Sequence, residues 1–456
     1  IANNVGRKRK ELWTENGEGE KVILRQFETG YEEADYVATD ITAKAREGIC
    51  AYGDCAVLYR TNAQSRLFEE RFIASNIPYK IVGGVNFYAR KEIKDLLAYL
   101  KTVDNAKDDL AVRRIINVPK RGIGATTLNR VQNYALQQGI GFYDALKAAE
   151  EIPTLGRSAS KLKPFVTLIQ TMRSKAAYIG VTELLQEIIE KTGYVAELEA
   201  ENTEEANQRI LNIDELISKA ASYEADESRE GPATLSGFLE EVALVADIDS
   251  VDETQDYVVL MTLHSAKGLE FPQVYLAGME DGLFPSYMSI CSDNSMEEIE
   301  EERRLCYVGI TRAKERLSIS CAKQRMIRGE TQYNKVSRFV KEIPAEFLAG
   351  EIQKEREPEK YKPTMSQFAR QAFRAKPMAM SQSGGMRQTP SAKDFGKSAD
   401  NRKLSYDVGD RVKHMKFGEG TVKQIVSGGR DHEVTVEFDG AGVKKMFAAF
   451  AKLQKL

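Results

Sequence analysis

Hydrophobic and polar positions change their period along the chain, and these changes divide the sequence into successive parts. Apolar, β-branched runs at 22–27, 56–59 and 78–82 are typical of strands, and amphipathic segments at 32–47 and 66–75 are typical of helices. Strands and helices that alternate in this way form parallel sheets with right-handed crossovers. The first part of the chain is therefore predicted to be an α/β domain.

The alternation then stops, and from about residue 91 to residue 249 the pattern has a helical period. Helices are predicted at 91–103, 110–117, 127–138, 162–178, 182–192, 205–223 and 234–243. Strands resume at Tyr257, with further runs at 274–277 and 317–320. The few strands on each side of the helices are too few for a covered parallel sheet, so we expect a helical domain inserted into one α/β domain. The alternative is two unrelated domains in tandem.

The final part of the chain differs in composition. Residues 354–403 are rich in Pro, Met, Gln, Ser, Lys and Gly without periodicity, which is typical of a flexible linker. From Tyr406, short apolar alternations return between turn glycines, which predicts a small antiparallel β-barrel. The whole pattern predicts a first α/β segment at 1–85, an inserted helical domain at 86–252, a second α/β segment at 253–350, a linker at 351–403 and a barrel at 404–456.

The composition fits a chain with several packed cores. It has 456 residues and a formal net charge of −3, a balance that argues neither for nor against nucleic acid. Neither the five scattered cysteines nor the three histidines have metal-ligand spacing, so we predict no metal site and reduced thiols in a cytoplasmic protein. No apolar run is long enough for a membrane span, and no signal peptide opens the chain. An isoleucine at position 1 indicates an internal cut.

Two stretches carry the candidate chemistry. Tyr257 to Phe271 reads Y-V-V-L-M-T-L-H-S-A-K-G-L-E-F, an apolar run that breaks into a polar loop with one glycine. We expect such a strand to deliver donors to the carboxyl edge of the sheet, where α/β proteins bind ligands. Leu305 to Leu317 reads L-C-Y-V-G-I-T-R-A-K-E-R-L and sets Arg312 beside a hydroxyl. A fixed arginine near a nucleotide can offset the charge that develops on a transferring phosphoryl group.

These stretches resemble motifs V and VI of superfamily 1A DNA helicases of the PcrA/UvrD type. The resemblance runs from end to end of the chain, but it covers only the carboxyl half of such a protein. It implies a RecA-like motor domain, an inserted helical domain that contacts duplex DNA, and a Tudor-like barrel. It also implies that Arg312 is an arginine finger for the γ-phosphate of ATP, that Glu270 accepts from the ribose, and that Gly268 lies close to a phosphate. The simpler interpretations are a structural arginine paired with the acidic run at 297–302, a helix-start carboxylate and a turn glycine.

In this family ATP with Mg²⁺ lies between two motor domains, so the nucleotide would be bound jointly with an amino-terminal domain. The sequence lacks the phosphate-cradling Gly-x-x-x-x-Gly-Lys-Ser/Thr motif. Its nearest lookalike, ending in Gly396, Lys397 and Ser398, has serine at the first glycine position and no strand before it. This chain alone is therefore predicted not to hydrolyse ATP.

The resemblance also implies two sets of DNA contacts. Single-stranded DNA would be held by Arg60, Asn62, Thr262, His264 and Lys267. A duplex junction would meet the Gly-x-Gly turn of a helix-hairpin-helix, with Lys120, Arg121, Gly122 and Gly124. Each has a simpler interpretation: a helix cap for Asn62, a loop cap for Thr262, a structural histidine, a surface lysine, and a plain turn between helices.

These interpretations predict the carboxyl half of an ATP-dependent 3′→5′ DNA helicase that unwinds duplex DNA in repair and replication. Its end barrel would bind RNA polymerase, as in the family. A competing hypothesis is a non-catalytic module that binds DNA and RNA polymerase as this fragment, with Arg312 and Glu270 vestigial. A helicase–nuclease subunit is a third alternative, but no nuclease-like carboxylate cluster follows the motor domain.

Overall fold

The chain forms two units, which are described separately. The computed structural model describes residues 3–5, 17–229, 231–246, 256–350, 406–414, 418–427, 432–439, 442–447 and 453–455. The larger unit spans 1–359 and the smaller 360–456. The linker predicted at 351–403 lies outside the described residues.

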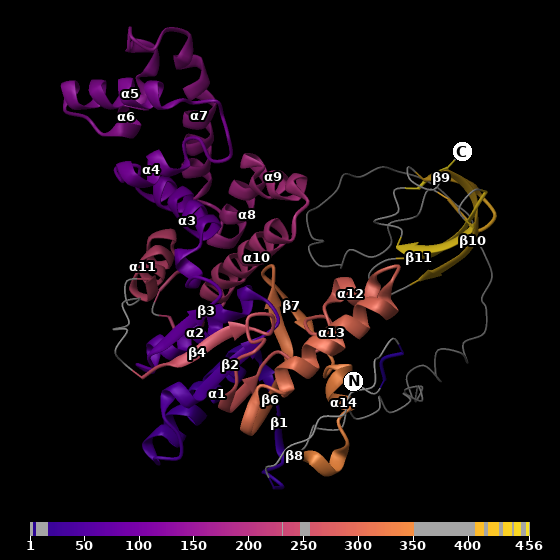
Figure 1. Cartoon of the computed structure of the whole chain (residues 1–456). Coiled ribbons are helices and arrows are strands. Elements are labelled where there is room, and N and C mark those ends of the chain that lie inside the picture. Colours follow the sequence, from indigo (N-terminus) through magenta and orange to yellow (C-terminus); the bar gives the residue numbers. More distant parts are fainter. Residues whose placement is uncertain are drawn as a thin grey trace, which may run out of the picture. The chain divides into compact units, whose positions relative to one another are not determined.

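The larger unit is built on one sheet (Figure 1). Its strands are β1 (Val22–Thr29), β2 (Cys55–Tyr59), β3 (Tyr79–Val82), β4 (Val258–Thr262), β5 (Phe271–Leu276), β6 (Ala313–Ile327), β7 (Glu330–Tyr333) and β8 (Leu348–Ala349). They lie in the order β3-β4-β2-β5-β6-β1-β8, all parallel, and β7 pairs antiparallel with β6. The predicted strands are confirmed, although β6 is longer than its apolar run.

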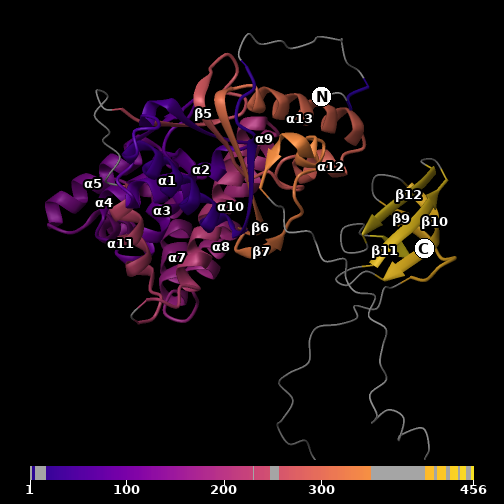
Figure 2. The same cartoon turned by 90° about the horizontal axis from the view of Figure 1, so that it is seen from below.

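Helices cover both faces of this sheet, as Figure 2 shows. Every residue of β2 is buried, and its side chains alternate between two cores. Val57 and Tyr59 face α1 (Gly30–Arg46) and α2 (Ser65–Ala74), whereas Ala56 and Leu58 face the core of α13 (Ser295–Ile310) and α14 (Arg338–Lys341). A short helix, α12 (Tyr287–Cys291), precedes α13. Burial on both faces explains why these strands read as continuous apolar runs.

A helical domain is inserted between β3 and β4. Its helices are α3 (Lys91–Asp104), α4 (Asp109–Ile115), α5 (Ala125–Gln138), α6 (Phe142–Lys147), α7 (Ala159–Lys175), α8 (Val181–Thr192), α9 (Tyr194–Glu201), α10 (Glu204–Glu224) and α11 (Leu235–Ala246). They share a hydrophobic core of their own. The strands on either side of the insertion pair directly, Tyr79 with Val258, so insertion is confirmed and tandem domains are excluded.

Ion pairs and hydrogen bonds join the inserted domain to the α/β domain. Arg66 on α2 pairs with Glu215 on α10 at 2.7 Å, and Arg328 in the β6–β7 turn pairs with Asp214 at 2.8 Å. Several of these side chains come from segments far apart in the sequence. The interface is therefore polar, unlike the apolar cores on either side of it.

The smaller unit is an antiparallel sheet. It contains β9 (Arg411–His414), β10 (Gly418–Ser427), β11 (His432–Phe438), β12 (Gly442–Phe447) and β13 (Gln454–Lys455), in the order β12-β11-β10-β9-β13. Its core includes the side chains of Val412, Val422, Val434, Val436 and Phe438. The antiparallel strands were predicted, but the pairings within the described tail leave β12 and β13 at opposite ends and do not close a barrel.

No helix in the described ranges is long and apolar enough to cross a bilayer. Within the same ranges, no three side chains of His, Cys, Asp or Glu gather as they would around a metal ion.

Candidate nucleotide and DNA sites

The predicted site residues lie at two opposite edges of the sheet. Arg60 follows β2 and His264 follows β4, and these strands pair in parallel, so both residues lie at the carboxyl edge. Phe271 begins β5 and pairs with Ala313 at the start of β6, so Glu270 and Arg312 lie at the amino edge. The expectation that the whole stretch from Tyr257 serves the carboxyl edge is wrong, because residues 263–270 cross from one edge to the other.

Arg312 is held by oxygen atoms of the chain. Its Nε donates to the carbonyl of Val308 at 2.9 Å, one Nη to the carbonyl of Leu269 at 2.8 Å, and the other Nη to the hydroxyl of Thr311 at 3.0 Å. No carboxylate among the described residues pairs with Arg312, so it is not the surface ion-pair arginine that the acidic run at 297–302 allowed. The bond to Leu269 brings Arg312 next to Glu270.

The other predicted nucleotide residues are open to solvent. Gly268 has a φ of +88°, a left-handed conformation that favours glycine, and a Cβ added there would meet nothing within 4 Å. The side chain of Glu270 is exposed, as is that of Lys267 in the loop at 263–270, and neither side chain has a hydrogen-bond partner in the described part of the chain. The amino edge therefore presents the carboxylate of Glu270, the guanidinium of Arg312 and an unobstructed backbone at Gly268.

The helix that ends just before Arg312, α13, packs tightly on the loop at 263–270. A Cβ at Gly309 would lie 2.4 Å from Cδ2 of Leu263, whose side chain is fully buried. Arg303 fixes the outer face of α13 through a bidentate pair with Glu342, with the shortest contact at 2.8 Å. Close packing of α13 against Leu263 thus favours glycine at position 309. The sequence alone had given no role to this glycine.

At the carboxyl edge, Arg60 is paired with a carboxylate. Its Nε and Nη2 donate to the carboxylate of Glu302 on α13, with contacts of 3.0 and 2.7 Å. Its backbone N–H donates to Oε1 of Gln64 at 3.0 Å. The sequence did not reveal Glu302 and Gln64 as partners of Arg60. Glu302 is 242 residues away and meets Arg60 only in the fold, and the turn that holds Gln64 has no strong sequence signature.

The remaining carboxyl-edge residues have mixed roles. Asn62 begins a 3₁₀ turn (Asn62–Gln64), and it is Thr61 rather than Asn62 that caps it. The hydroxyl of Thr262 accepts from the N–H of Ser265 at 3.3 Å, as its loop-capping interpretation predicts. His264 is exposed on one side, and partial burial of its ring, followed by the positive charge of Arg60, lowers its pKa below the ordinary value. The imidazole is therefore neutral at neutral pH.

The Gly-x-Gly turn of the inserted domain joins α4 to α5. Lys120, Gly122 and Gly124 are exposed, and Gly124 directly precedes α5. Arg121 instead donates from Nη1 to the carbonyls of Ile115 and Ile116, at 2.9 and 3.1 Å, and from Nη2 to the hydroxyl of Tyr99 at 2.5 Å. The expectation that Arg121 presents its charge to DNA does not fit this geometry, because the guanidinium closes the end of α4.

Ser286 caps α12 by accepting from the N–H of Ser289 at 3.1 Å.

Comparison with known proteins agrees with the fold. The UvrD-like helicase C-terminal domain matches residues 1–324, and the PcrA/UvrD tudor domain matches residues 408–455. The chain is 42% identical over 455 residues to "ATP-dependent DNA helicase PcrA" of Staphylococcus aureus strain Mu50, and 41% identical to the protein of that name from Staphylococcus epidermidis strain ATCC 12228. Each alignment covers all of this chain but 59% of the relative. The chain therefore belongs to the family of the UvrD-like helicase C-terminal domain.

Proposed function

We propose that this chain is the carboxyl part of an ATP-dependent 3′→5′ DNA helicase that works in DNA repair and replication in the cytoplasm. The observation that carries the proposal is the environment of Arg312. Its guanidinium has no carboxylate partner in the described residues, and it is bonded beside Glu270 at an open edge of the sheet.

The amino edge offers groups that could contact the γ-phosphate and the ribose of an ATP molecule bound between this domain and a second motor domain. Guanidinium carries five N–H donors, and Arg312 uses three of them, so donors remain for a γ-phosphate. Glu270 is free to accept from ribose hydroxyls, and Gly268 leaves room for a phosphate. The phosphate-cradling loop and the ligands of Mg²⁺ would belong to the amino-terminal motor domain.

Single-stranded DNA would be held by Arg60, Asn62, Thr262 and His264 at the carboxyl edge and by Lys267 in the loop at 263–270. Closure of the two motor domains around ATP would bring Arg312 to the γ-phosphate, and hydrolysis would allow the domains to open again. If the grip on DNA alternates with closure, the protein steps in one direction along the strand. Such stepping is a population shift driven by the nucleotide.

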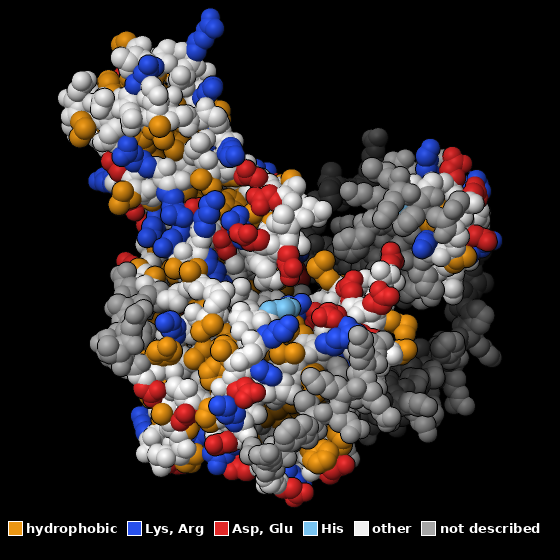
Figure 3. Space-filling model, viewed as in Figure 1, with side chains coloured by type: hydrophobic (Ala, Val, Ile, Leu, Met, Phe, Trp, Pro, Cys, Tyr) orange, Lys and Arg blue, Asp and Glu red, His pale blue; other side chains and the backbone are white. Residues whose placement is uncertain are grey.

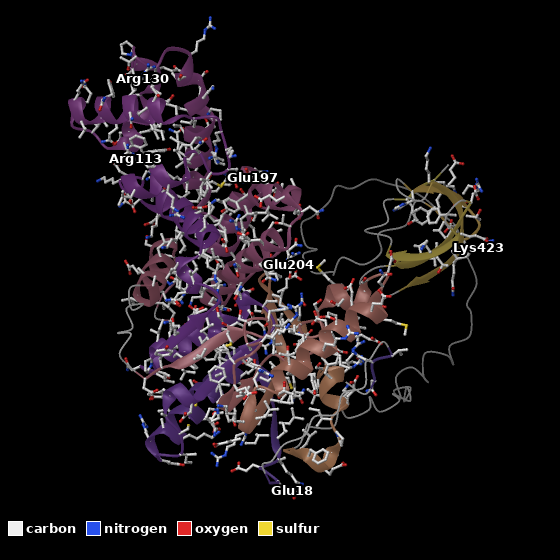
Figure 4. The ribbon with its side chains drawn as sticks, in the orientation of Figure 1. Glu18, Arg113, Arg130, Glu197, Glu204 and Lys423 are labelled. Carbon is white, nitrogen blue, oxygen red and sulfur yellow. The ribbon has the colours of Figure 1, made fainter. Side chains whose placement is uncertain are left out.

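The inserted domain would contact duplex DNA. Lys91, Lys94 and Lys101 lie on one face of α3, because they are three and seven residues apart, and all three are exposed. Figure 3 shows Lys and Arg side chains gathered over α3 and α4. Arg113 on α4 and Arg130 on α5 belong to the same domain (Figure 4). No ion pair among the described residues engages the three lysines, which supports a contact with phosphates.

The experiment that tests the proposal is DNA-stimulated ATP hydrolysis by the full-length protein, with and without Arg312→Ala. We expect the substitution to lower turnover by roughly three orders of magnitude or more, because an arginine finger stabilises the transition state, while ATP still binds. Hydrolysis is measured by phosphate release, and ATP binding by fluorescence of a labelled analogue.

Arg304→Ala is the matched control. Arg304 lies on α13, the helix that leads to Arg312. Its partners are the carboxylates of Glu300 and Glu301, at 3.2 and 2.6 Å. Exposed pairs of this kind contribute about 0–1 kcal/mol, so turnover should stay near that of the unmodified protein. Near-normal hydrolysis by Arg312→Ala would contradict the finger assignment. An unmodified protein without DNA-stimulated hydrolysis would favour the non-catalytic module.

We further propose that the tail unit at 404–456 binds RNA polymerase. The tudor-domain match supports a protein-binding role for this unit. Val408 and Val443 are 60% exposed on it, which is unusual for valine and suits a protein contact.

A further inference from the structure

The carboxyl edge and the arginine-finger helix are joined by one buried ion pair. The side chain of Arg60 is 17% exposed and that of Glu302 is 6% exposed. Three contacts of 2.7–3.0 Å join the two groups across 242 residues of sequence. A bidentate pair with this burial has a defined geometry, because a planar guanidinium meets a planar carboxylate.

The pair leaves part of Arg60 available. Its Nε and Nη2 form the edge that faces Glu302, and the described residues offer no partner to its Nη1. A phosphate of single-stranded DNA can therefore bind Nη1 while the other edge stays on Glu302. The ion pair and the DNA contact do not exclude each other, and the carboxylate fixes the direction of the free edge.

Glu302 and Arg312 are joined by the second half of α13. Glu302 lies within this helix, which ends at Ile310, and Arg312 follows two residues later. The helical part from Glu302 to Ile310 spans about 12 Å along the axis. Gly309 packs against Leu263 and Arg303 is paired with Glu342, so this half of α13 is held in place. A shift of Glu302 at the carboxyl edge must therefore move the segment that positions Arg312.

We propose that Glu302 is a positioning residue that aims Arg60 at single-stranded DNA and couples DNA occupancy to Arg312 through α13. The inference rests on the proposed function and adds the physical link between its two sites. Coupling between sites is reciprocal, so DNA should raise nucleotide affinity by the same factor by which nucleotide raises DNA affinity.

The test is a double-mutant cycle in the full-length protein with Glu302→Gln, Arg60→Lys and both together. Glu302→Gln keeps the size of the side chain but removes its charge. Arg60→Lys keeps the charge for DNA but removes the bidentate edge. Affinity for a dT oligonucleotide is measured by fluorescence anisotropy at fixed salt, with and without a non-hydrolysable ATP analogue. The ratio of the two affinities gives the coupling.

In the unmodified protein we expect a coupling ratio in the usual allosteric range of about 5- to 150-fold. Each single variant should bring the ratio to within about twofold of one, and the double variant should be no worse than the single variants. Glu297→Gln is the matched control: the side chain is exposed on the same helix, without a hydrogen-bond partner in the described chain, and should keep the full ratio. A purely structural role for Glu302 would lower the unfolding temperature without this pattern.

The outcomes separate the two proposals. If the unmodified protein shows DNA-stimulated hydrolysis but both single variants keep its coupling ratio, this inference is overturned and the proposed function stands. Equal loss in Glu297→Gln would also overturn it, since the effect would then come from the general charge of α13. Absence of DNA-stimulated hydrolysis in the unmodified protein would overturn both. If Glu302→Gln fails to fold, the coupling ratio of Arg60→Lys alone tests the inference. This variant keeps an opposite charge beside Glu302 and is therefore expected to fold.

Discussion

Three arginines that the sequence predicts as functional cations have different surroundings in the fold. Arg312 donates to carbonyl and hydroxyl oxygens beside the proposed nucleotide edge. Arg60 donates to Glu302 from one edge of its guanidinium, and its Nη1 has no partner in the described residues. Arg121 donates to carbonyls at the end of α4 and to the hydroxyl of Tyr99. Arg312 and Arg121 have the same kinds of partner, so it is their places in the fold that distinguish them.

The contrast at the Gly-x-Gly turn gives a prediction about Lys120 and Arg121. Arg121→Ala should lower the free energy of unfolding by about 2–3 kcal/mol, because carbonyls at the end of α4 lose a charged donor. Lys120→Ala should change stability by less than about 0.5 kcal/mol, because the side chain is exposed. It should instead reduce the salt slope of duplex-junction binding by about one unit. Urea unfolding and binding across a range of KCl concentrations measure the two effects.

The opposite pattern would restore Arg121 to the DNA surface. It would consist of an unchanged free energy of unfolding in Arg121→Ala, with a salt slope reduced as much as in Lys120→Ala. The two substitutions remove the same charge at neighbouring positions, so each serves as the control for the other.

Much of the site could be predicted from the sequence because its motifs are local. The resemblance of its motifs to those of the helicase family pointed to Gly268, Glu270 and Arg312, and the structure brings these three together at one edge. Sequence patterns failed where a partner is distant, as in Arg60 with Glu302. They also failed for short helices such as α6 and α9, which have too few turns for a clear period. The crossing of residues 263–270 depends on strand order, which no local pattern records.

At the scale of elements, α13 and the loop at 263–270 both lead to the amino edge of the sheet. The loop runs from the end of β4 to the start of β5, and α13 ends just before β6, which pairs with β5. They pack against each other where Gly309 meets Leu263. The two elements should therefore move as one unit, and their contact should set the position of Arg312.

This packing predicts a specific stability defect in Gly309→Ala. The added Cβ would lie 2.4 Å from Leu263 and 3.5 Å from Leu276, so a buried side chain must shift at a cost of about 1–3 kcal/mol. Leu263→Ala makes room, so the double variant should be less destabilised than the sum of the single variants by about 1 kcal/mol or more. Urea unfolding of all three variants measures the difference.

Gly17→Ala is the control, because a Cβ there meets nothing within 4 Å and stability should hardly change. Strict additivity between Gly309→Ala and Leu263→Ala would show that the two residues do not compete for space. The close approach would then not explain the glycine.

At the scale of the molecule, the chain consists of the larger unit, which is the proposed motor unit, and the tail unit, and the two have separate cores. The nucleotide and DNA edges both belong to residues 60–312, in the larger unit. The five-stranded tail sheet contributes no residue to either edge as the sequence predicts them. Separate cores allow separate functions, because one unit can be removed without exposing the interior of the other.

We therefore predict that deletion of residues 404–456 separates partner binding from motor activity. The shortened full-length protein should keep DNA-stimulated ATP hydrolysis within about twofold, because the larger unit retains its whole core. It should lose binding to purified RNA polymerase, measured by biolayer interferometry, while the tail unit carried on an unrelated protein should gain it. If the shortened protein still binds polymerase, the polymerase contact lies on the motor unit and not on the tail. Loss of hydrolysis with an unchanged unfolding temperature would instead mean that the tail acts on the motor, and that the independence inferred from the separate cores is wrong.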